Sequence, residues 1–355
     1  MTNPPPFYDD HARLLAYKDA EGREHPVRSP ADWAKRREHI LLNMQLVMGP
    51  LPDASRRVPL DRRTIEEDRL PGCRRLKITF AVERDDYVPA YLLLPEQLKG
   101  QAPAMLCPHP SGPRGKDSPA DPSYDSPNVH FAIELAQRGY VTLAPDYPGY
   151  GEYPCDPYAR GYVSATMKGI WNHMRAVDLL ESLPEVDAAR IGTIGISLGG
   201  HNSLFVAVFD SRIRAIVSCC GFNAFPKYYG GNLTGWSHKG YMPRIAEVYG
   251  KDPRKMPFDF PEIVAALAPR AFFTCSTVDD PNFEVSGVRD CIAAARPVYE
   301  LLGAADKLVA EYPAGGHDFP PQTRQMAYAW LDEQLGPLRN PRAARNTASP
   351  PPGRK

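Results

Sequence analysis

Short apolar runs alternate with amphipathic stretches from about residue 103 to residue 335. The runs are bounded by turn residues, which predicts strands at AMLCP, YVTLAP, RIGTIGI, RIRAIVSCC, AFFTCST and KLVAEYP. The stretches between them repeat apolar residues every three or four positions, as in TMKGIWNHMRAVDLLESL, which predicts helices. Alternating strands and helices predict an α/β fold, with a mostly parallel central sheet and helices on both of its faces.

The chain before residue 103 has a different pattern. Ser29, Pro30 and Asp32 form a helix start with a capping serine and a proline at the first turn, and we expect this helix to end near Met48, before Gly49. The segments RRLKITFAV and YVPAYLLLP follow, joined by the polar turn ERDD, which predicts an antiparallel hairpin. An N-terminal helix plus a hairpin is therefore expected as an extension at one edge of the parallel sheet.

The same patterns predict the domain boundaries. We expect a partly disordered N-terminal tail over 1–28, a helical extension over 29–73 and one catalytic domain over 74–338. A loop-rich excursion over 222–260 is expected to lie over the site. Residues 339–355, NPRAARNTASPPPGRK at their core, lack apolar periodicity and are predicted to be a disordered tail.

Composition narrows the classes of partner. Of 355 residues, 42 are Lys or Arg and 42 are Asp or Glu, so the formal net charge is zero. This balance gives no basic surface for nucleic acid and none for an anionic membrane. The 39 prolines predict many rigid turns and extended loops. Charge therefore favours a small-molecule partner, and the sequence carries no signal for an oligomeric state.

Features of the N-terminus and of the cysteines bear on the compartment. The start MTNPPPFYDDHARLL has no basic region followed by an apolar run, so no secretory signal is predicted. The seven cysteines lack CxxC spacing, and several lie inside apolar runs, so they are interpreted as buried thiols rather than as disulfides or zinc ligands. A cytoplasmic location is the expectation.

The candidate nucleophile is Ser197. It stands in the pattern G-x-S-x-G, from Gly195 to Gly199, between a predicted strand and a predicted helix. A serine on such a turn projects its hydroxyl above the sheet at a helix N-terminus, and the flanking glycines leave room for the tight turn. The strand and helix on either side separate this pattern from a chance match.

A serine needs a base, and the base needs a carboxylate. His317 follows the last predicted strand within GGHDF and is the candidate base. The loop after AFFTCST supplies Asp280, the favoured acid because it precedes a proline at the strand's exit. Asp279 and Glu284 stay open as alternatives.

The oxyanion of an acyl-transfer intermediate needs two backbone N–H donors. Leu198, which follows the nucleophile, is one candidate. The loop after AMLCP continues His109-Pro110-Ser111-Gly112, where Pro110 has no N–H, so the second donor is assigned to Ser111 or a neighbour. His109 is interpreted chiefly as a structural brace for this loop.

Together, Ser197, Asp280, His317, the HPSG loop and the segment APDYPGYGE resemble the α/β-hydrolase superfamily. Within it, WNHMRAVDLLESLPEVDAARIGTIGISLGG and PADWAKRREHILLNMQLVMGPLP resemble the dienelactone-hydrolase and acetyl-xylan-esterase-like branch, which shares its catalytic domain with prolyl oligopeptidases. The resemblance spans roughly residues 30–335. The chain departs from it at Pro110, and at Ser197, where dienelactone hydrolases have cysteine.

The resemblance implies a serine esterase that cleaves a small or sugar-linked carboxylic ester through an acyl-enzyme, without metal or organic cofactor. Two other hypotheses are a peptidase of the prolyl-oligopeptidase type and a catalytically silent binding protein. The peptidase is disfavoured because about 100 residues precede the catalytic region, too few for a propeller. Candidate pocket residues are His109, Tyr147, Tyr150, Trp236 and His238, for which packing of proline-rich loops is the alternative role.

Overall fold

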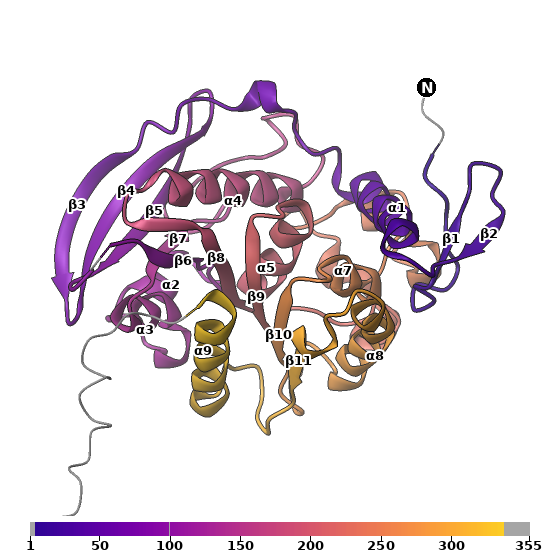
Figure 1. Cartoon of the computed structure of the whole chain (residues 1–355). Helices are drawn as coiled ribbons and strands as arrows, with labels where there is room; N and C mark the ends of the chain where they lie inside the picture. Colours follow the sequence, from indigo (N-terminus) through magenta and orange to yellow (C-terminus); the bar gives the residue numbers. More distant parts are fainter. Residues whose placement is uncertain (1–3, 99, 337–355) are drawn as a thin grey trace, which may run out of the picture.

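One nine-stranded sheet runs through the molecule in the order β11-β10-β9-β8-β6-β7-β5-β4-β3 (Figure 1). The computed structural model describes residues 4–98 and 100–336, so the predicted tail 339–355 lies outside the described residues. The strands from β11 to β7 are parallel, and β5, β4 and β3 continue the sheet in antiparallel pairs. The predicted α/β-hydrolase fold is thereby confirmed. The strands are β3 (Arg63–Leu70), β4 (Cys73–Glu83), β5 (Asp86–Pro95), β6 (Ala102–Leu106), β7 (Val141–Pro145), β8 (Val186–Ile196), β9 (Ile213–Cys219), β10 (Ala271–Cys275) and β11 (Leu308–Glu311).

Helices cover both faces of the sheet. They are α1 (Pro30–Met48), α2 (Asp117–Ala120), α3 (Phe131–Arg138), α4 (Ala165–Ser182), α5 (Leu198–Phe209), α6 (Arg244–Glu247), α7 (Phe260–Ala266), α8 (Val285–Leu301) and α9 (Pro321–Leu335). Helices α3 and α9 lie together on one face, where Glu134 pairs with Arg324, and α4 and α5 lie on the other (Figure 1). Strands β6 and β7 between them are buried along their whole length, as an apolar core requires.

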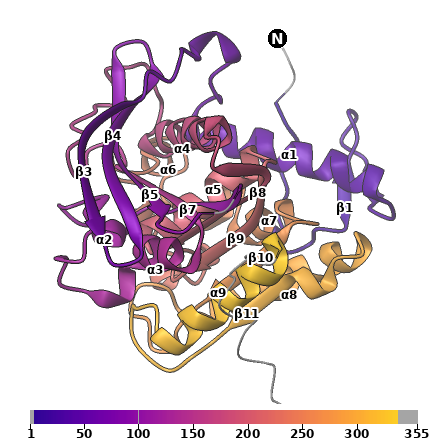
Figure 2. The same ribbon diagram turned by 60° about the vertical axis from the view of Figure 1, so that its left-hand side comes forward.

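The hairpin forms as predicted, but the extension has one more strand. Cys73–Glu83 and Asp86–Pro95 pair in register, and the unpredicted β3 adds to β4. Figure 2 shows β3 and β4 curving together at this edge of the sheet. The boundary expected at residue 73 is therefore displaced, because residues 63–70 belong to the sheet and not to the helical extension.

Residues 4–28 are structured, which differs from the partly disordered tail that was expected. β1 (Ala16–Lys18) and β2 (Glu24–Pro26) form a small antiparallel sheet, and Tyr8 and Leu14 are buried. The apolar residues of this segment are few and widely spaced, so its sequence does not predict that it packs on the rest of the protein. Helix α1 follows as predicted, with the Ser29 side chain accepting a hydrogen bond from the Asp32 N–H.

A buried ion cluster attaches this N-terminal segment to the catalytic domain. Arg36 on α1 pairs with Glu262 on α7, and both side chains are fully buried. His11 Nδ1 lies 2.8 Å from a Glu262 carboxylate oxygen, and its Nε2 lies 3.0 Å from the Met256 carbonyl oxygen. The segment around His11 is therefore held by polar and charged contacts inside the protein.

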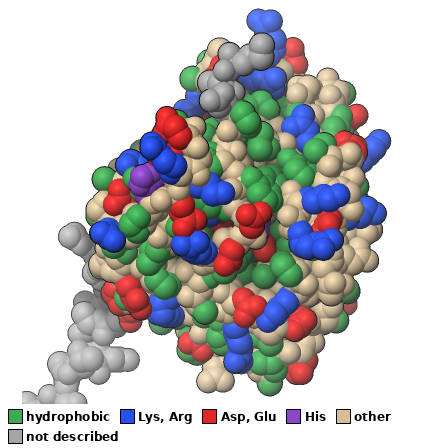
Figure 3. Space-filling model, turned by 90° about the vertical axis from the view of Figure 1, so that its right-hand side faces the viewer, with side chains coloured by type: hydrophobic (Ala, Val, Ile, Leu, Met, Phe, Trp, Pro, Cys, Tyr) green, Lys and Arg blue, Asp and Glu red, His purple; other side chains and the backbone are tan. Residues whose placement is uncertain are grey.

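The surface on this side mixes charges of both signs. Figure 3, which shows the side where α1 and β1 lie, has Lys, Arg, Asp and Glu side chains interspersed, with apolar side chains between them. Over residues 4–98 and 100–336, no helix is both long and apolar enough to cross a bilayer.

Candidate active site

The turn between β8 and α5 has the geometry of a nucleophile elbow. Ser197 has φ 56° and ψ −122°, a strained conformation for a residue with a side chain, and its N–H donates to the Cys219 carbonyl oxygen at 2.9 Å. A Cβ at Gly195 would lie 2.3 Å from the Gly199 carbonyl carbon. A Cβ at Gly199 would lie 2.1 Å from the Pro108 carbonyl oxygen. Glycine is therefore required on both sides of Ser197.

The candidate residues follow strands in the parallel part of the sheet, so they lie at the same end of that sheet. Ser197 directly follows β8, and the neighbouring strands β10 and β11 lead into the loops that carry Asp280 and His317. Adjacent strands lie about 5 Å apart, so their parallel carboxyl ends bring these loops together. The Cys219 thiol at the end of β9 lies 3.3 Å from the Asp318 carbonyl oxygen, which places the His317 loop beside β9, the neighbour of the strand that precedes Ser197.

The structure pairs His317 with Asp280. The Nδ1–H of His317 donates to both carboxylate oxygens of Asp280, at 2.9 and 3.1 Å. Asp280 also accepts from the N–H groups of Asn282 and Phe283, at 2.8 and 3.3 Å. The Asp280 side chain is 1% exposed and that of His317 is 24% exposed, so the ring can be reached while the carboxylate cannot.

The alternative acids lie elsewhere. Asp279 is exposed, and its carboxylate accepts a long hydrogen bond from the Gly315 N–H at 3.4 Å. Glu284 precedes α8 and contacts Ser286. Of the three candidate carboxylates, Asp280 is the one that contacts the histidine.

Electrostatics at this edge favour an ionised Asp280 and a proton on His317. Burial by itself would raise the pKa of Asp280, but the hydrogen bonds from His317 and the Asn282 N–H outweigh it and hold this pKa below its usual range. Burial would likewise lower the pKa of His317, but Asp280 and the Cys220 thiol raise it to about 9. The pair therefore stabilises the imidazolium that His317 becomes on accepting a proton, and the neutral ring that acts as a general base gains population as the pH rises toward 9.

The loop after β6 lies against the elbow. The Pro108 and His109 carbonyl oxygens face Gly199, and Ser111 stands exposed two residues further on. Leu198 is the first residue of α5, where an N–H has no acceptor within the helix. Both assigned oxyanion donors therefore belong to segments that border Ser197.

His109 fastens this loop to the next one. Its Nδ1–H donates to the Pro110 carbonyl oxygen at 2.7 Å, and its Nε2 accepts from the Tyr147 N–H at 3.0 Å, which fits one neutral tautomer. The ring is 1% exposed. Burial lowers the pKa of His109, in keeping with a neutral ring. His109 therefore links the two loops by hydrogen bonds, and its buried ring does not form an exposed part of a pocket.

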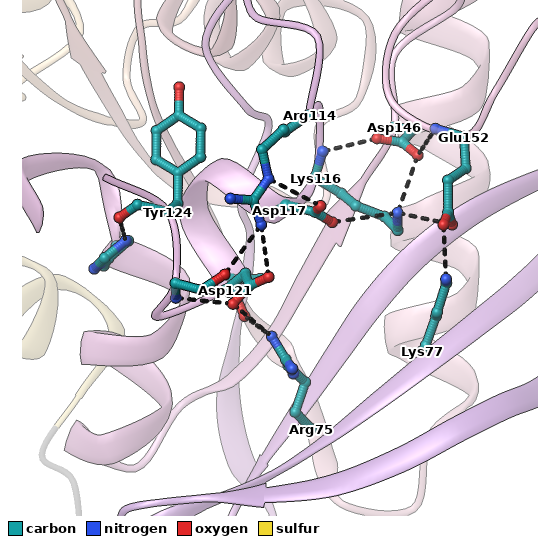
Figure 4. A network of polar contacts seen from close by, with 12 residues as sticks. Arg75, Lys77, Arg114, Lys116, Asp117, Asp121, Tyr124, Asp146 and Glu152 are labelled. Carbon is teal, nitrogen blue, oxygen red and sulfur yellow. Dashed lines mark hydrogen bonds and ion pairs between the residues drawn. The ribbon is translucent and has the colours of Figure 1, made fainter. Parts of the chain in front are cut away.

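A network of ion pairs, drawn in Figure 4, holds the same two loops together. Asp146, at the exit of β7, accepts from the Lys116 N–H at 2.7 Å and from the Glu152 N–H at 3.0 Å. The Lys116 ammonium lies 3.5 Å from Asp146 and 3.0 Å from Glu152, which also binds Lys77 at 2.7 Å. The buried Asp146 therefore anchors the loop after β6, to which Ser111 belongs.

The remaining pocket candidates separate into buried and exposed groups. Tyr147 is buried and donates to the Gly240 carbonyl oxygen at 3.1 Å, and Trp236 is buried among aromatic rings. Tyr150 is half-buried beside His109, and His238 is exposed. The packing role that the sequence left open therefore fits Tyr147 and Trp236, while Tyr150 and His238 stand nearer to solvent.

Cys220 is a member of the site that sequence reasoning missed. It follows β9, and its thiol, a carboxylate oxygen of Asp280 and a ring nitrogen of His317 all lie within 4.8 Å of one another. Contacts with Cys219 and His317 lower the pKa of Cys220 to about 6 despite burial. The sequence shows two cysteines at the end of a predicted strand. It does not show the order of the strands in the sheet, which is what brings Cys220 close to His317.

Known proteins similar to this chain agree with the fold. A putative hydrolase, YtaP of Bacillus subtilis, is 27% identical over 313 residues, which cover 85% of this chain and 99% of that protein. The structure of a glucuronoyl esterase from Solibacter usitatus has a TM-score of 0.72 and 22% identity, covering 93% of this chain and 99% of its own. A putative acetyl xylan esterase from Bacteroides fragilis has a TM-score of 0.61 and 19% identity, covering 85% and 86%. The model of the alpha/beta hydrolase family matches residues 118–338, and the chain belongs to that family.

Proposed function

We propose that the protein is a serine hydrolase that cleaves a carboxylic ester through Ser197, His317 and Asp280. The observation that carries the proposal is the Asp280–His317 pair, whose atoms lie 2.9 Å apart. The loops of this pair follow strands β10 and β11, at the same end of the sheet as the strained Ser197 turn. A histidine oriented by a carboxylate, together with a serine on such a turn at the same end of the sheet, supports the set of groups that acyl transfer requires.

In the first half of the reaction the Ser197 Oγ attacks the ester carbonyl carbon, and the Ser197 proton passes to His317 Nε2. The C=O electron pair moves onto oxygen, where the N–H groups of Leu198 and Ser111 would hold the oxyanion. Collapse expels the alcohol, which takes the proton from His317, and leaves an acyl-enzyme. Water, deprotonated by the same ring, then releases the acid and restores Ser197. Asp280 keeps the Nδ1–H directed toward itself, so that Nε2 faces the serine.

The substrate class we propose is a small acyl ester or a sugar-linked ester. The solved structures of similar fold include esterases named for glucuronoyl and acetyl xylan groups, which supports this choice. Aromatic rings also extend away from the base: Phe283 lies 5.8 Å from His317 and 6.0 Å from Trp236, and Trp236 lies 5.4 Å from Tyr241. Phe283 and Trp236 are buried and pack against their neighbours, so the partly exposed Tyr241 is the ring of this row that would contact a sugar ring or a small acyl group.

Peptidase activity is the second hypothesis, and the N-terminal segment weighs against it. Residues 4–62 form α1 and two short strands, so this part of the chain builds no propeller that would enclose a peptide.

The test is hydrolysis of p-nitrophenyl acetate and butyrate by the wild type and by Ser197→Ala, with p-nitroanilide and thioester analogues beside them. Fluorophosphonate labelling of both proteins reports the nucleophile directly. We expect ester turnover and labelling in the wild type and neither in the variant. Turnover that persists in Ser197→Ala would overturn the mechanism, and faster anilide than ester cleavage would favour the peptidase.

A further inference from the structure

Cys220 occupies a position between the strands that carry the two ends of the catalytic set. Strand β9 lies between β8, which ends at Ser197, and β10, which leads to Asp280, and Cys220 is the residue directly after β9. Its N–H donates to the Cys275 carbonyl oxygen of β10 at 2.8 Å. The sheet itself therefore fixes where the thiol lies.

The atoms around the Cys220 sulfur are all potential metal ligands. One Asp280 carboxylate oxygen, one His317 ring nitrogen and the sulfur lie within 4.8 Å of one another. The Thr277 hydroxyl lies 3.6 Å from the sulfur, and the Asp318 carbonyl oxygen lies 3.5 Å from it. Cys220 and Asp280 are buried, and His317 is partly exposed to solvent.

Thiolate, imidazole and carboxylate form a ligand set that suits Zn²⁺. Zinc bonds of about 2.0 Å to nitrogen or oxygen and about 2.3 Å to sulfur place tetrahedral ligand atoms roughly 3–4 Å apart. The His317 Nδ1 and Asp280 oxygen are already 2.9 Å apart, so a modest movement of the three side chains would suffice. A fourth position remains for the Thr277 hydroxyl or for water.

We propose that Cys220, Asp280 and His317 form a site for Zn²⁺ and similar thiophilic divalent cations, and that its occupation switches the esterase off. The inhibitory consequence rests on the proposed function, whereas the binding site itself does not. The Cys220 thiol loses its proton to solvent and its sulfur binds the cation. The cation also takes the Nδ1 lone pair, so the ring proton moves to Nε2, where it blocks acceptance of the Ser197 proton.

Binding is measured first with Co²⁺, because a thiolate–Co²⁺ bond gives a charge-transfer absorption that reports sulfur ligation without any reference to turnover. The full chain is reduced, freed of metal and titrated. We expect one Co²⁺ per chain with this band in the wild type and in the matched control Cys219→Ala. The band should vanish in Cys220→Ala and Cys220→Ser, while Asp280→Asn should keep it and weaken Co²⁺ binding by about tenfold or more.

Inhibition is measured next, as the Zn²⁺ concentration that halves p-nitrophenyl acetate turnover, with each variant compared with its own metal-free rate. Cys220→Ser should raise this concentration by about tenfold or more, Cys219→Ala should leave it unchanged, and a chelator should restore the wild-type rate.

The outcomes separate the two proposals. A thiolate band in a protein without esterase activity would overturn the proposed function and leave the site standing. Esterase activity without a band, a band that survives Cys220→Ala, or equal Zn²⁺ sensitivity of the wild type and Cys220→Ser would overturn the site. Two substitutions at Cys220 guard against one of them failing to fold, and circular dichroism of each variant checks this.

Discussion

Two regions of the molecule pair a histidine with a carboxylate, and they use the pair differently. At the candidate active site Asp280 is buried, and its partner His317 is 24% exposed and therefore partly open to solvent. Between α1 and α7, His11 is 11% exposed and its partner Glu262 is fully enclosed together with Arg36. Arg36 supplies a cation for Glu262, and both ring nitrogens of His11 are occupied by hydrogen-bond partners. One pair is arranged for proton transfer and the other for attachment, so substitutions should separate activity from stability.

The largest effect is expected at the nucleophile. Ser197→Ala should lower kcat by about 10⁴-fold or more, because Ser197 forms the acyl-enzyme in the proposed mechanism, while the free energy of unfolding should change little. Steady-state turnover and urea denaturation measure the two quantities. If Ser197→Ala kept a tenth of the wild-type kcat, Ser197 would not be the nucleophile, and the His317–Asp280 region would not be the site of the reaction proposed for it.

The two neighbouring aspartates give the next test. Asp280→Asn should lower kcat by about 10³- to 10⁴-fold, because an amide no longer fixes the Nδ1–H tautomer or stabilises the imidazolium. Asp279→Asn is the matched control and should stay near the wild type, since the exposed Asp279 carboxylate accepts a long hydrogen bond from the Gly315 N–H and is not paired with His317. If Asp279→Asn proved to be the inactive variant, the acid would be misassigned.

The opposite profile is expected in the N-terminal cluster. Arg36→Met leaves Glu262 buried without its cation, which should lower the free energy of unfolding by about 3–5 kcal/mol. Activity per folded molecule should stay within about twofold. Arg254→Met removes a pair in which the arginine is 90% exposed and screened by water, so its unfolding free energy should stay close to that of the wild type. Lost activity at unchanged stability in Arg36→Met would break the distinction between the two regions.

A smaller, pH-dependent effect is expected at His11. Burial would lower the pKa of His11, but the charge and hydrogen bond of Glu262 outweigh it and leave this pKa raised. The stabilisation from this pair is therefore complete below the unfolded-state pKa of about 6.5 and is lost as the pH rises through the higher folded-state pKa. Urea denaturation of the wild type between pH 6 and 9 should show this decline, and His11→Gln should flatten it. A decline of equal size in the variant would exclude His11 as its source.

Local chemistry made the elbow predictable. Gly195 and Gly199 have to be glycine because backbone atoms of the strand-to-helix turn leave no room for a Cβ. Such a local requirement can be recognised in a few consecutive residues. Asp280 could be ranked above Asp279 but not assigned, because which carboxylate meets His317 depends on the direction of a loop.

Long-range packing accounts for what the sequence did not reveal. Cys220 belongs to the site because β9 lies between β8 and β10, and strand order has no local signature. Tyr8 and Leu14 are buried although their neighbours in the sequence are polar, and the Tyr8 ring packs on α1, where it contacts His39 and Arg36. The charged β3 lacked the apolar alternation that marks a strand, so pairing with β4, rather than its own propensity, makes it one.

Strand β3 is the last strand of the sheet, and all of its residues except Leu70 are exposed. A bare strand edge invites another chain to add itself, which is how sheets grow into fibres. Here the edge carries Arg63, Glu66, Glu67, Asp68 and Arg69, and a bulge interrupts it between Thr64 and Glu66. An incoming strand would bury these charges and meet a twisted register. Replacing Glu66 and Glu67 with valine should therefore turn a self-limiting sheet into an aggregating one.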